Sequence, residues 1–250
     1  MLWSSKPVEV FEPGRLRLVR TRPPVLSADE RRAMDRAWDE AIRANPALYD
    51  GPAVVCVEFE HQPATSVLTL VWAPVSYRYF SLRRVPGVQT APCVFAAVVQ
   101  PTVEGGLLVG RTSSATAVAG RVQLPGGVAE PSADPAGDGD DTWLAREAAR
   151  ELAEETGITA SSARLKLCMV TRTSGGNVGV IFRAPALPEN EVRDRFAALK
   201  AREVAAGRTP EFDDVMTVAS IHELAELGGP YADSSIQVVR HYLDSISQSS

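Results

Sequence analysis

Apolar residues along the chain follow two spacings, one typical of helices and one typical of strands. The first helical segment begins with Ser27, followed three positions later by Glu30, a pair that caps helix N-termini. Apolar residues then recur at helical spacing from Met34 to Ile42, and Asn45 precedes a proline. The sequence therefore predicts a helix that starts after Ser27 and ends near Asn45.

Alternating apolar and polar residues follow this helix. They predict strands over residues 55–60 and 68–72, and an extended stretch over residues 77–82. Proline and glycine then cluster, which is typical of a boundary between units. We therefore expect two domains. A smaller N-terminal α/β unit over residues 1–90 would serve substrate recognition or dimerisation, and a larger domain would cover residues 91–250.

The larger unit is predicted to mix strands and helices. Two apolar runs, residues 93–99 and 107–110, flank a Glu-Gly-Gly turn and are expected to form a hairpin. A strong helix is expected over residues 143–156, ended by Gly157 as its C-cap. Further strands are expected at residues 122–124, 165–170, 178–182 and 215–219, and further helices at residues 189–206, 221–227 and 235–246. Antiparallel-looking strands flanked by helices favour an α+β sandwich.

Four glutamates crowd one side of the helix predicted over residues 143–156. At about 100° per residue they fall within an arc of roughly 100°; they are Glu147, Glu151, Glu154 and Glu155. Like charges at this spacing cost on the order of 0.2–0.5 kcal/mol a pair, and a divalent cation offsets that repulsion. Magnesium prefers hard oxygen ligands and suits such a row of carboxylates. The alternative is a solvated surface helix whose glutamates pair with neighbouring arginines.

Two glycines precede this helix in the sequence Leu-Pro-Gly-Gly, residues 124–127. Glycine lets a backbone carbonyl approach a metal ion where a side chain would obstruct it. Together with the later run Arg-Glu-Leu-Ala-Glu-Glu-Thr-Gly-Ile, residues 150–158, these glycines resemble the Nudix box, the motif of a family of diphosphate hydrolases. The end of the family pattern, R-E-apolar-x-E-E-x-G-apolar, is matched at every defined position.

The resemblance implies a Nudix α/β/α sandwich and a magnesium site, with manganese as a second possible ion. The metal ligands it implies are Glu151, Glu154 and Glu155, helped by the carbonyl of Gly126. Arg150 would orient one of these carboxylates and lie on the substrate side. Glu155 and Glu154 are the first catalytic candidates, because a metal ion held there would activate a water for attack on a diphosphate.

The chain departs from the family pattern by an insertion. Between Gly127 and Arg150 lie 22 residues, whereas the family has about 13, so about nine are inserted. The insertion falls in an acidic, proline- and glycine-rich loop over residues 130–141. The early glutamate of the family box therefore has no clear counterpart, although Thr142 falls in its register and Asp140 is nearby.

A further carboxylate often comes, in this family, from a loop before the last strand. The loop over residues 207–214 lies there, and Glu211 is the candidate general base or extra ligand, ahead of two aspartates in the same loop. A polar surface loop without a catalytic role is the alternative.

Short stretches elsewhere resemble the family members that hydrolyse UDP-glucose and UDP-galactose to UMP and a sugar 1-phosphate. These stretches are residues 37–40, 45–52, 76–80 and 126–131. Within them, Tyr77 and Arg78 are candidates to stack on a base or to contact a phosphate. Core packing and a surface ion pair are the alternatives for the two side chains.

Composition limits partners and location. The formal net charge of -5 over 250 residues argues against a nucleic-acid partner. Three cysteines without a CxxC spacing are expected to be buried thiols in a reducing compartment. The first residues lack the apolar core of a secretory signal, and no apolar run approaches the roughly 18–20 residues that cross a bilayer. We expect a cytoplasmic protein with no membrane partner, and a homodimer by analogy of fold.

The expected function is magnesium-dependent hydrolysis of the diphosphate bond in a small nucleoside diphosphate derivative, with UDP-glucose or UDP-galactose the best match. One alternative is hydrolysis of ADP-ribose or another nucleoside diphosphate-linked compound. Another is a non-catalytic regulator that binds a nucleotide on the same fold. The complete set of box glutamates argues against the regulator.

Overall fold

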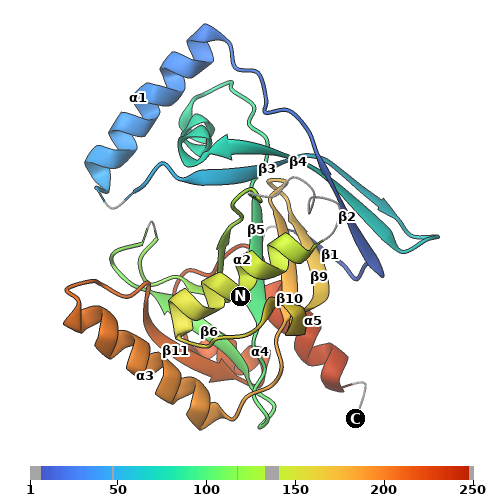
Figure 1. Cartoon of the computed structure of the whole chain (residues 1–250), viewed down its shortest axis with the longest axis vertical. Helices are drawn as coiled ribbons and strands as arrows, with labels where there is room; N and C mark the ends of the chain where they lie inside the picture. The colour runs from blue at the N-terminus through green and yellow to red at the C-terminus, as the bar shows by residue number, and fades with distance from the viewer. Residues whose placement is uncertain (1–6, 47, 117, 133–140, 248–250) are drawn as a thin grey trace.

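The computed structural model describes residues 7–46, 48–116, 118–132 and 141–247, which form a mixed α+β structure (Figure 1). A five-stranded sheet contains, in spatial order, β1 (Val8–Phe11), β9 (Lys166–Thr173), β10 (Val178–Arg183), β5 (Val94–Val99) and β8 (Gly126–Val128). A second sheet contains β11 (Phe212–Val218), β6 (Leu107–Thr112) and β7 (Val122–Gln123). A third contains β2 (Arg15–Arg20), β4 (Val67–Ser76) and β3 (Pro52–Gln62).

The helices surround these sheets. The α-helices are α1 (Ala28–Ala44), α2 (Thr142–Thr156), α3 (Glu189–Ala205), α4 (Ile221–Glu226) and α5 (Ser235–Ser247), and the 3₁₀ helices are η1 (Tyr77–Arg84) and η3 (Ser162–Arg164). The prediction for α1 is confirmed. Ser27 and Glu30 form a reciprocal capping box, and Asn45 is the C-cap residue.

The extended stretch predicted over residues 77–82 is wrong, because this segment is the 3₁₀ helix η1. A period of three residues brings Tyr79 and Leu82 to one side, where both are buried in a cluster with Met34 of α1. The Ser81 hydroxyl also donates a hydrogen bond to the Met34 carbonyl, over 3.1 Å. Packing against α1 therefore overrides the strand-like alternation of the sequence.

The predicted hairpin over residues 93–110 is also wrong. Backbone pairing between its two segments is limited to one bridge, between Pro101, just after β5, and Leu107. Beyond that bridge β5 pairs in parallel with β10, whereas β6 pairs antiparallel with β11 in another sheet. Both strands are buried on both faces, so their apolar pattern does not specify a partner.

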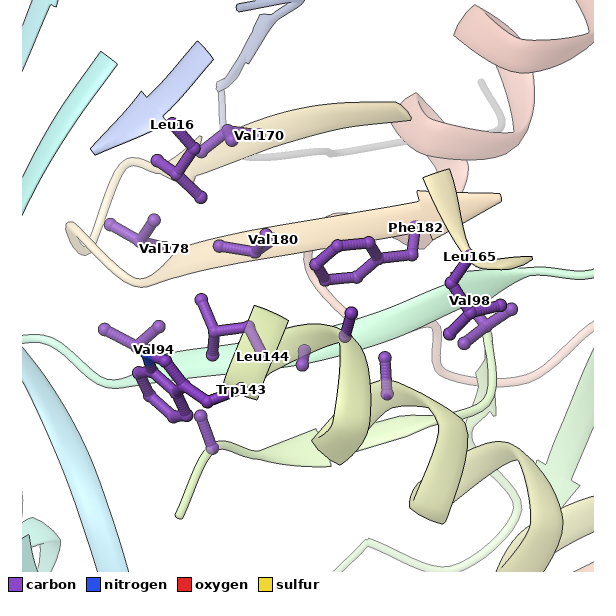
Figure 2. Packing of buried hydrophobic residues seen from close by; sticks show 14 of the residues in the cluster. Leu16, Val94, Val98, Trp143, Leu144, Leu165, Val170, Val178, Val180 and Phe182 are labelled. Carbon is purple, nitrogen blue, oxygen red and sulfur yellow. The ribbon is translucent and has the colours of Figure 1, made fainter. Parts of the chain in front are cut away.

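The core lies on both faces of the five-stranded sheet. Alternate residues of β10 separate to opposite sides, as the pleat of a strand requires. Val180 and Phe182 pack in one cluster with Leu144 of α2, whereas Ile181 packs in another with residues of α5. Figure 2 shows Val180 and Phe182 on the side of the sheet that α2 covers. The helix that carries the box glutamates, α2, is therefore packed against the core on one face of the sheet.

The N-terminal residues pack against the rest of the chain. Strand β1 pairs antiparallel with β9 in the five-stranded sheet. Trp72 of β4 lies against Trp143 of α2, with ring centroids 5.2 Å apart. In Figure 1, β3 and β4 lie on one side of α2, and β6 and β11 on the other. Residues on both sides of position 90 thus share one hydrophobic cluster, and the division into two domains stays a prediction.

The cysteine prediction holds for two of three residues. Cys56 and Cys93 are buried free thiols, whereas Cys168 is only partly buried. In the described ranges, every helix is too short or too polar to cross a bilayer.

Candidate functional site

The helix that carries the box glutamates is α2, which runs from Thr142 to Thr156 as expected from the sequence. Gly157 caps its C-terminus in the left-handed conformation, with a φ of 75°. Ala148 and Leu152 are buried in the core, which anchors one side of the helix. The other side faces a cavity.

This cavity has a volume of about 750 Å³, within the range of small-molecule sites. Its acidic side is formed by Glu130, Glu151, Glu154 and Glu211. Glu211 lies just before β11, and its carbonyl accepts a hydrogen bond from the Ser113 amide over 2.8 Å. The fold therefore brings Glu211 to two of the box glutamates across almost sixty positions of sequence.

Glu155 is buried behind the acidic side of the cavity and does not line it. Its side chain is buried, and the residue is 1% exposed. One carboxylate oxygen, Oε2, accepts a hydrogen bond from the Gly126 amide over 2.7 Å. The other, Oε1, is buried and has no hydrogen-bond partner among the described residues. Burial first, and then the charges of Glu211 and Glu151, raise the pKa of Glu155 well above its ordinary value.

The glycine loop fits closely around these carboxylates. Gly126 has a φ of 154°, and a Cβ there would lie 2.6 Å from the Cα of Ala97. A Cβ at Gly127 would lie 2.7 Å from Oε1 of Glu151. Both positions therefore lack room for a side chain, one because of backbone and one because of a carboxylate.

Arg150 is surrounded by carboxylates. Its guanidinium donates hydrogen bonds to Glu147 over 2.9 Å, to Glu151 over 2.8 Å and to Glu154 over 2.7 Å. Glu130 lies 3.7 Å away. Burial alone would lower the pKa of Arg150, but the hydrogen bond that it donates to Glu147 and the neighbouring negative charges raise it above its ordinary value. The guanidinium stays charged and holds the glutamates in place; its role toward substrate stays a prediction.

The carboxylates that line the cavity are harder to ionise than free ones. Burial raises the pKa of Glu151 to about 7, with Glu211 and the other glutamates adding to the shift and Arg150 opposing it. Burial and then Glu154 raise the pKa of Glu211, which Arg121 and Arg150 partly offset. Several carboxylates thus share a space that lacks enough positive charge to neutralise them all.

We expect this charge imbalance to make the stability of the metal-free protein depend on pH. Glu151, Glu155 and Glu211 have folded-state pKa values above their unfolded values, so the folded chain binds more protons. With respect to these groups, the stability of the folded chain should therefore be greatest below about pH 4.5, the ordinary pKa of a glutamate, and should fall as the pH rises from there through about 7. Melting temperatures measured with EDTA across this range would check the slope. Excess magnesium should flatten it, and a slope that magnesium leaves unchanged would contradict the assignment.

A metal site is not preassembled. Within the described ranges, no three histidine, cysteine, aspartate or glutamate side chains are gathered as a ready metal cluster, and Glu154 turns toward Arg150 with 59% of its side chain exposed. The donor set still suits magnesium, which prefers carboxylate oxygens. The buried Oε1 of Glu155 lacks the partner that buried polar atoms normally have. The residues therefore fit a hard divalent cation.

The remaining predicted site residues are only partly brought together. Tyr77 lines the cavity and also packs edge-on against Trp38 and Phe80. Arg78 does not line it, and pairs instead with Asp50 over 3.1 Å. These contacts favour the structural alternatives for both side chains, and their substrate roles stay predictions.

The inserted loop lies largely outside the described residues. Residues 133–140, which include Asp140, are not described. Thr142 is the first residue of α2 and is exposed. The role of the early box glutamate is therefore not assigned to any described residue.

Sequence patterns did not single out four polar residues that line the cavity. They are Arg121, Gln123, Ser234 and Ser235. A weak signal was present, since Arg121 and Gln123 alternate with the apolar Val122 and Leu124 just before the glycine loop. No comparable pattern marks the two serines, because the segment at the start of α5 reaches the cavity only through the fold.

Neither protein-family profiles nor curated proteins gave a match to the chain. Similarities to solved structures were found. The NUDIX domain of Shewanella oneidensis NrtR, complexed with ADP ribose, is 16% identical, with 64% of this chain and 92% of that chain covered and a TM-score of 0.41. Another structure of that NrtR was solved with a 27mer DNA.

Two further similarities involve other proteins. The MutT protein from Methanosarcina mazei is 16% identical, with 65% of this chain and 99% of that chain covered and a TM-score of 0.40. A bifunctional NMN adenylyltransferase/ADP ribose pyrophosphatase from Francisella tularensis, complexed with AMP and a manganese ion, is 18% identical with a TM-score of 0.43; 67% of this chain and 45% of that chain are covered. These are distant similarities, and the site described above rests on the residues of this chain alone.

Proposed function

We propose that this chain is a magnesium-dependent hydrolase of the Nudix type that splits the diphosphate of a nucleoside diphosphate linked to a sugar. The observation that carries the proposal is the buried, partnerless Oε1 of Glu155 next to the glycine loop. Leaving such an atom without a partner costs about 1–3 kcal/mol, more for a charged group. A cation bound there would remove that cost and the repulsion among the neighbouring glutamates.

The side chains divide the chemical work. Glu151, Glu154 and Glu155 would hold the cation, and the Gly126 carbonyl is a further candidate ligand. When bound, magnesium would neutralise phosphate charge and make a water more acidic. Arg150 keeps Glu151 and Glu154 in position through its hydrogen bonds.

Glu211 is the proposed general base. It lines the same cavity as the glycine loop, and burial raises its pKa above the ordinary value. A base is most effective when its pKa lies near the working pH. Glu211 would accept the proton of the attacking water, after which the bond between the two phosphates breaks and a nucleoside monophosphate and a sugar phosphate are released.

The substrate class includes both sugar nucleotides suggested by the sequence, UDP-glucose and UDP-galactose, and ADP-ribose, the ligand of one similar structure. We still predict that the chain does not bind nucleic acid and that it forms a homodimer. A cavity of about 750 Å³ has room for any of these compounds.

A hydrolysis panel tests the proposal. UDP-glucose, UDP-galactose, ADP-ribose and a dinucleoside polyphosphate would each be incubated with the protein in magnesium or in EDTA. We expect magnesium-dependent release of UMP or AMP from at least one nucleotide sugar, with no free phosphate as first product. Nucleotide binding without turnover in magnesium or manganese would contradict the hydrolase and favour a regulator.

A further inference from the structure

Among the described residues, two arginines line the cavity, Arg121 and Arg150, and they differ in how many carboxylates lie near them. Arg150 is engaged by three glutamates. Arg121 also lines the cavity, yet no carboxylate lies within 4.0 Å of it in the described part of the chain. Its guanidinium makes one hydrogen bond there, from Nε to the Gln123 side-chain oxygen over 3.0 Å. Arg121 is therefore the cation whose remaining donors are available to a ligand.

Strand β7 fixes the direction of this arginine. Val122 is fully buried in the core beside α5. Arg121 comes directly before β7 and Gln123 is its last residue. Because successive side chains of a strand point to opposite faces, these two residues, on either side of Val122, point away from that core, and both line the cavity. Gln123 is itself buried, so the acceptor that holds Arg121 Nε has a defined position.

The segment that leads into α5 lies directly beside β7. The Val122 amide donates to the Pro230 carbonyl over 2.8 Å, and the Ala232 amide donates to the Val122 carbonyl over 3.0 Å. This pairing brings Ser234 and Ser235 to the same cavity wall. Strand β7 and the segment that leads into α5 are thus held side by side by backbone hydrogen bonds.

The two serines are buried polar groups that face the cavity. Ser234 is 7% exposed and Ser235 is 3% exposed. Neither hydroxyl hydrogen-bonds to another residue in the described ranges, and both line the cavity. They stand at the start of a helix of 13 residues, whose first turn leaves backbone N–H groups without acceptors inside the helix. Such an arrangement favours an anion.

We propose that Arg121, the hydroxyls of Ser234 and Ser235 and the first turn of α5 form a subsite for one phosphate group of the substrate. The subsite rests on the proposed function, because it receives part of the same diphosphate. Glu151, Glu154 and Glu211 would repel an incoming diphosphate, and the positive charge of the subsite would offset that repulsion. A guanidinium binds phosphate through two parallel hydrogen bonds, which also orients the group.

Calorimetric titration of inorganic pyrophosphate into the metal-free protein, in EDTA, tests the subsite. Arg121→Gln should weaken binding about tenfold or more, a loss of about 1.4 kcal/mol. Arg121→Lys should keep part of the affinity, because it retains the charge but not the planar fork. Arg17→Gln is the matched control, since Arg17 is an exposed arginine on β2 away from the cavity. It should change binding less than twofold.

A second pair of variants examines the helix start. Replacing both serines, Ser234→Ala with Ser235→Ala, should weaken pyrophosphate binding severalfold without lowering the melting temperature by more than a few degrees. Equal affinities of wild type and Arg121→Gln would overturn the subsite, as would absence of pyrophosphate binding by the wild type.

Turnover separates this subsite from the proposed function. With whichever nucleotide sugar is hydrolysed, Arg121→Gln should raise KM about tenfold or more. If the enzyme is active but Arg121→Gln changes neither its KM nor its affinity for pyrophosphate, the subsite alone is overturned. A protein that hydrolyses nothing, yet binds pyrophosphate through Arg121, would overturn the hydrolase and leave the subsite standing.

Discussion

Glu155→Gln is expected to lower magnesium-dependent turnover about a thousandfold, equivalent to about 4 kcal/mol, without unfolding the protein. Glutamine has the same shape, and its side-chain oxygen still accepts the hydrogen bond that the Gly126 amide gives to Glu155. What the substitution removes is the negative charge at the buried Oε1 position. Steady-state hydrolysis of the best panel substrate measures the loss.

The stability of this variant gives an independent check. Because the pKa of Glu155 is raised, ionising it costs free energy in the metal-free protein, and glutamine avoids that cost. In EDTA near pH 8 the variant should melt at the same temperature as the wild type or higher, and magnesium should stabilise it less.

A matched control for this variant is available on another helix. Glu191→Gln on α3 breaks only a surface pair with Arg195, which contributes about 0.3–0.5 kcal/mol, and should leave turnover unchanged. A Glu155→Gln protein that retains full activity would refute the role given to Glu155.

Gly126→Ala should cause the largest loss of stability of any single substitution in the glycine loop, about 3 kcal/mol. Its φ of 154° disfavours any residue with a side chain, and the new Cβ would lie 2.6 Å from the Cα of Ala97. That atom belongs to the backbone of β5, which is paired on both sides, with β10 and with β8, so it has little freedom to move. For a chain of this length the melting temperature should fall by about 6–12 °C.

Gly127→Ala should behave differently, because its Cβ would meet the end of a flexible side chain, Oε1 of Glu151. The fold should survive with a loss of a few degrees at most. Displacement of Glu151 should reduce magnesium-dependent turnover about 10- to 100-fold, as is typical when the surroundings of a metal ligand are disturbed.

Gly175→Ala provides the control for both glycine variants. The nearest atom to its Cβ is Oγ1 of Thr173, 3.9 Å away, an ordinary contact. Its stability and activity should stay close to those of the wild type. If Gly126→Ala were as stable as Gly175→Ala, the close packing described for the loop would be wrong.

Elements defined by local signals were predictable from the sequence. The capping box of Ser27 and Glu30 and the C-cap of Gly157 place α1 and α2 nearly to the residue. Such signals act within one or two turns of chain, so a sequence pattern contains them completely. The convergence of the box glutamates on α2 is local in the same sense.

Features that depend on distant partners were not predictable. Strands β5 and β6 are apolar on both faces, so their pattern gave a hairpin where the fold sends them to separate sheets. The segment after Ser76 alternates like a strand but coils into η1 because Tyr79 and Leu82 pack on α1. Pairing of β1 with β9 joins residues more than 150 positions apart, and no local pattern reports it.

The candidate site shows the same division. Motif matching named three of the four glutamates on the acidic side of the cavity, Glu151, Glu154 and Glu211, but not Glu130. It also favoured Arg78 and Arg150 as substrate contacts, although carboxylates from other positions engage both. Whether an arginine is paired or free depends on tertiary neighbours, and so Arg121 emerged only from the structure.

Manganese binding measured by electron paramagnetic resonance tests the central claim most directly, since it observes the cation at the glutamates without needing a substrate. The wild type should bind Mn²⁺, release it to excess magnesium, and lose at least about tenfold in affinity on Glu155→Gln but not on Glu191→Gln; a tenfold loss is about 1.4 kcal/mol. Equal Mn²⁺ affinities of the wild type and Glu155→Gln, or no Mn²⁺ binding by the wild type, would contradict a metal site on α2.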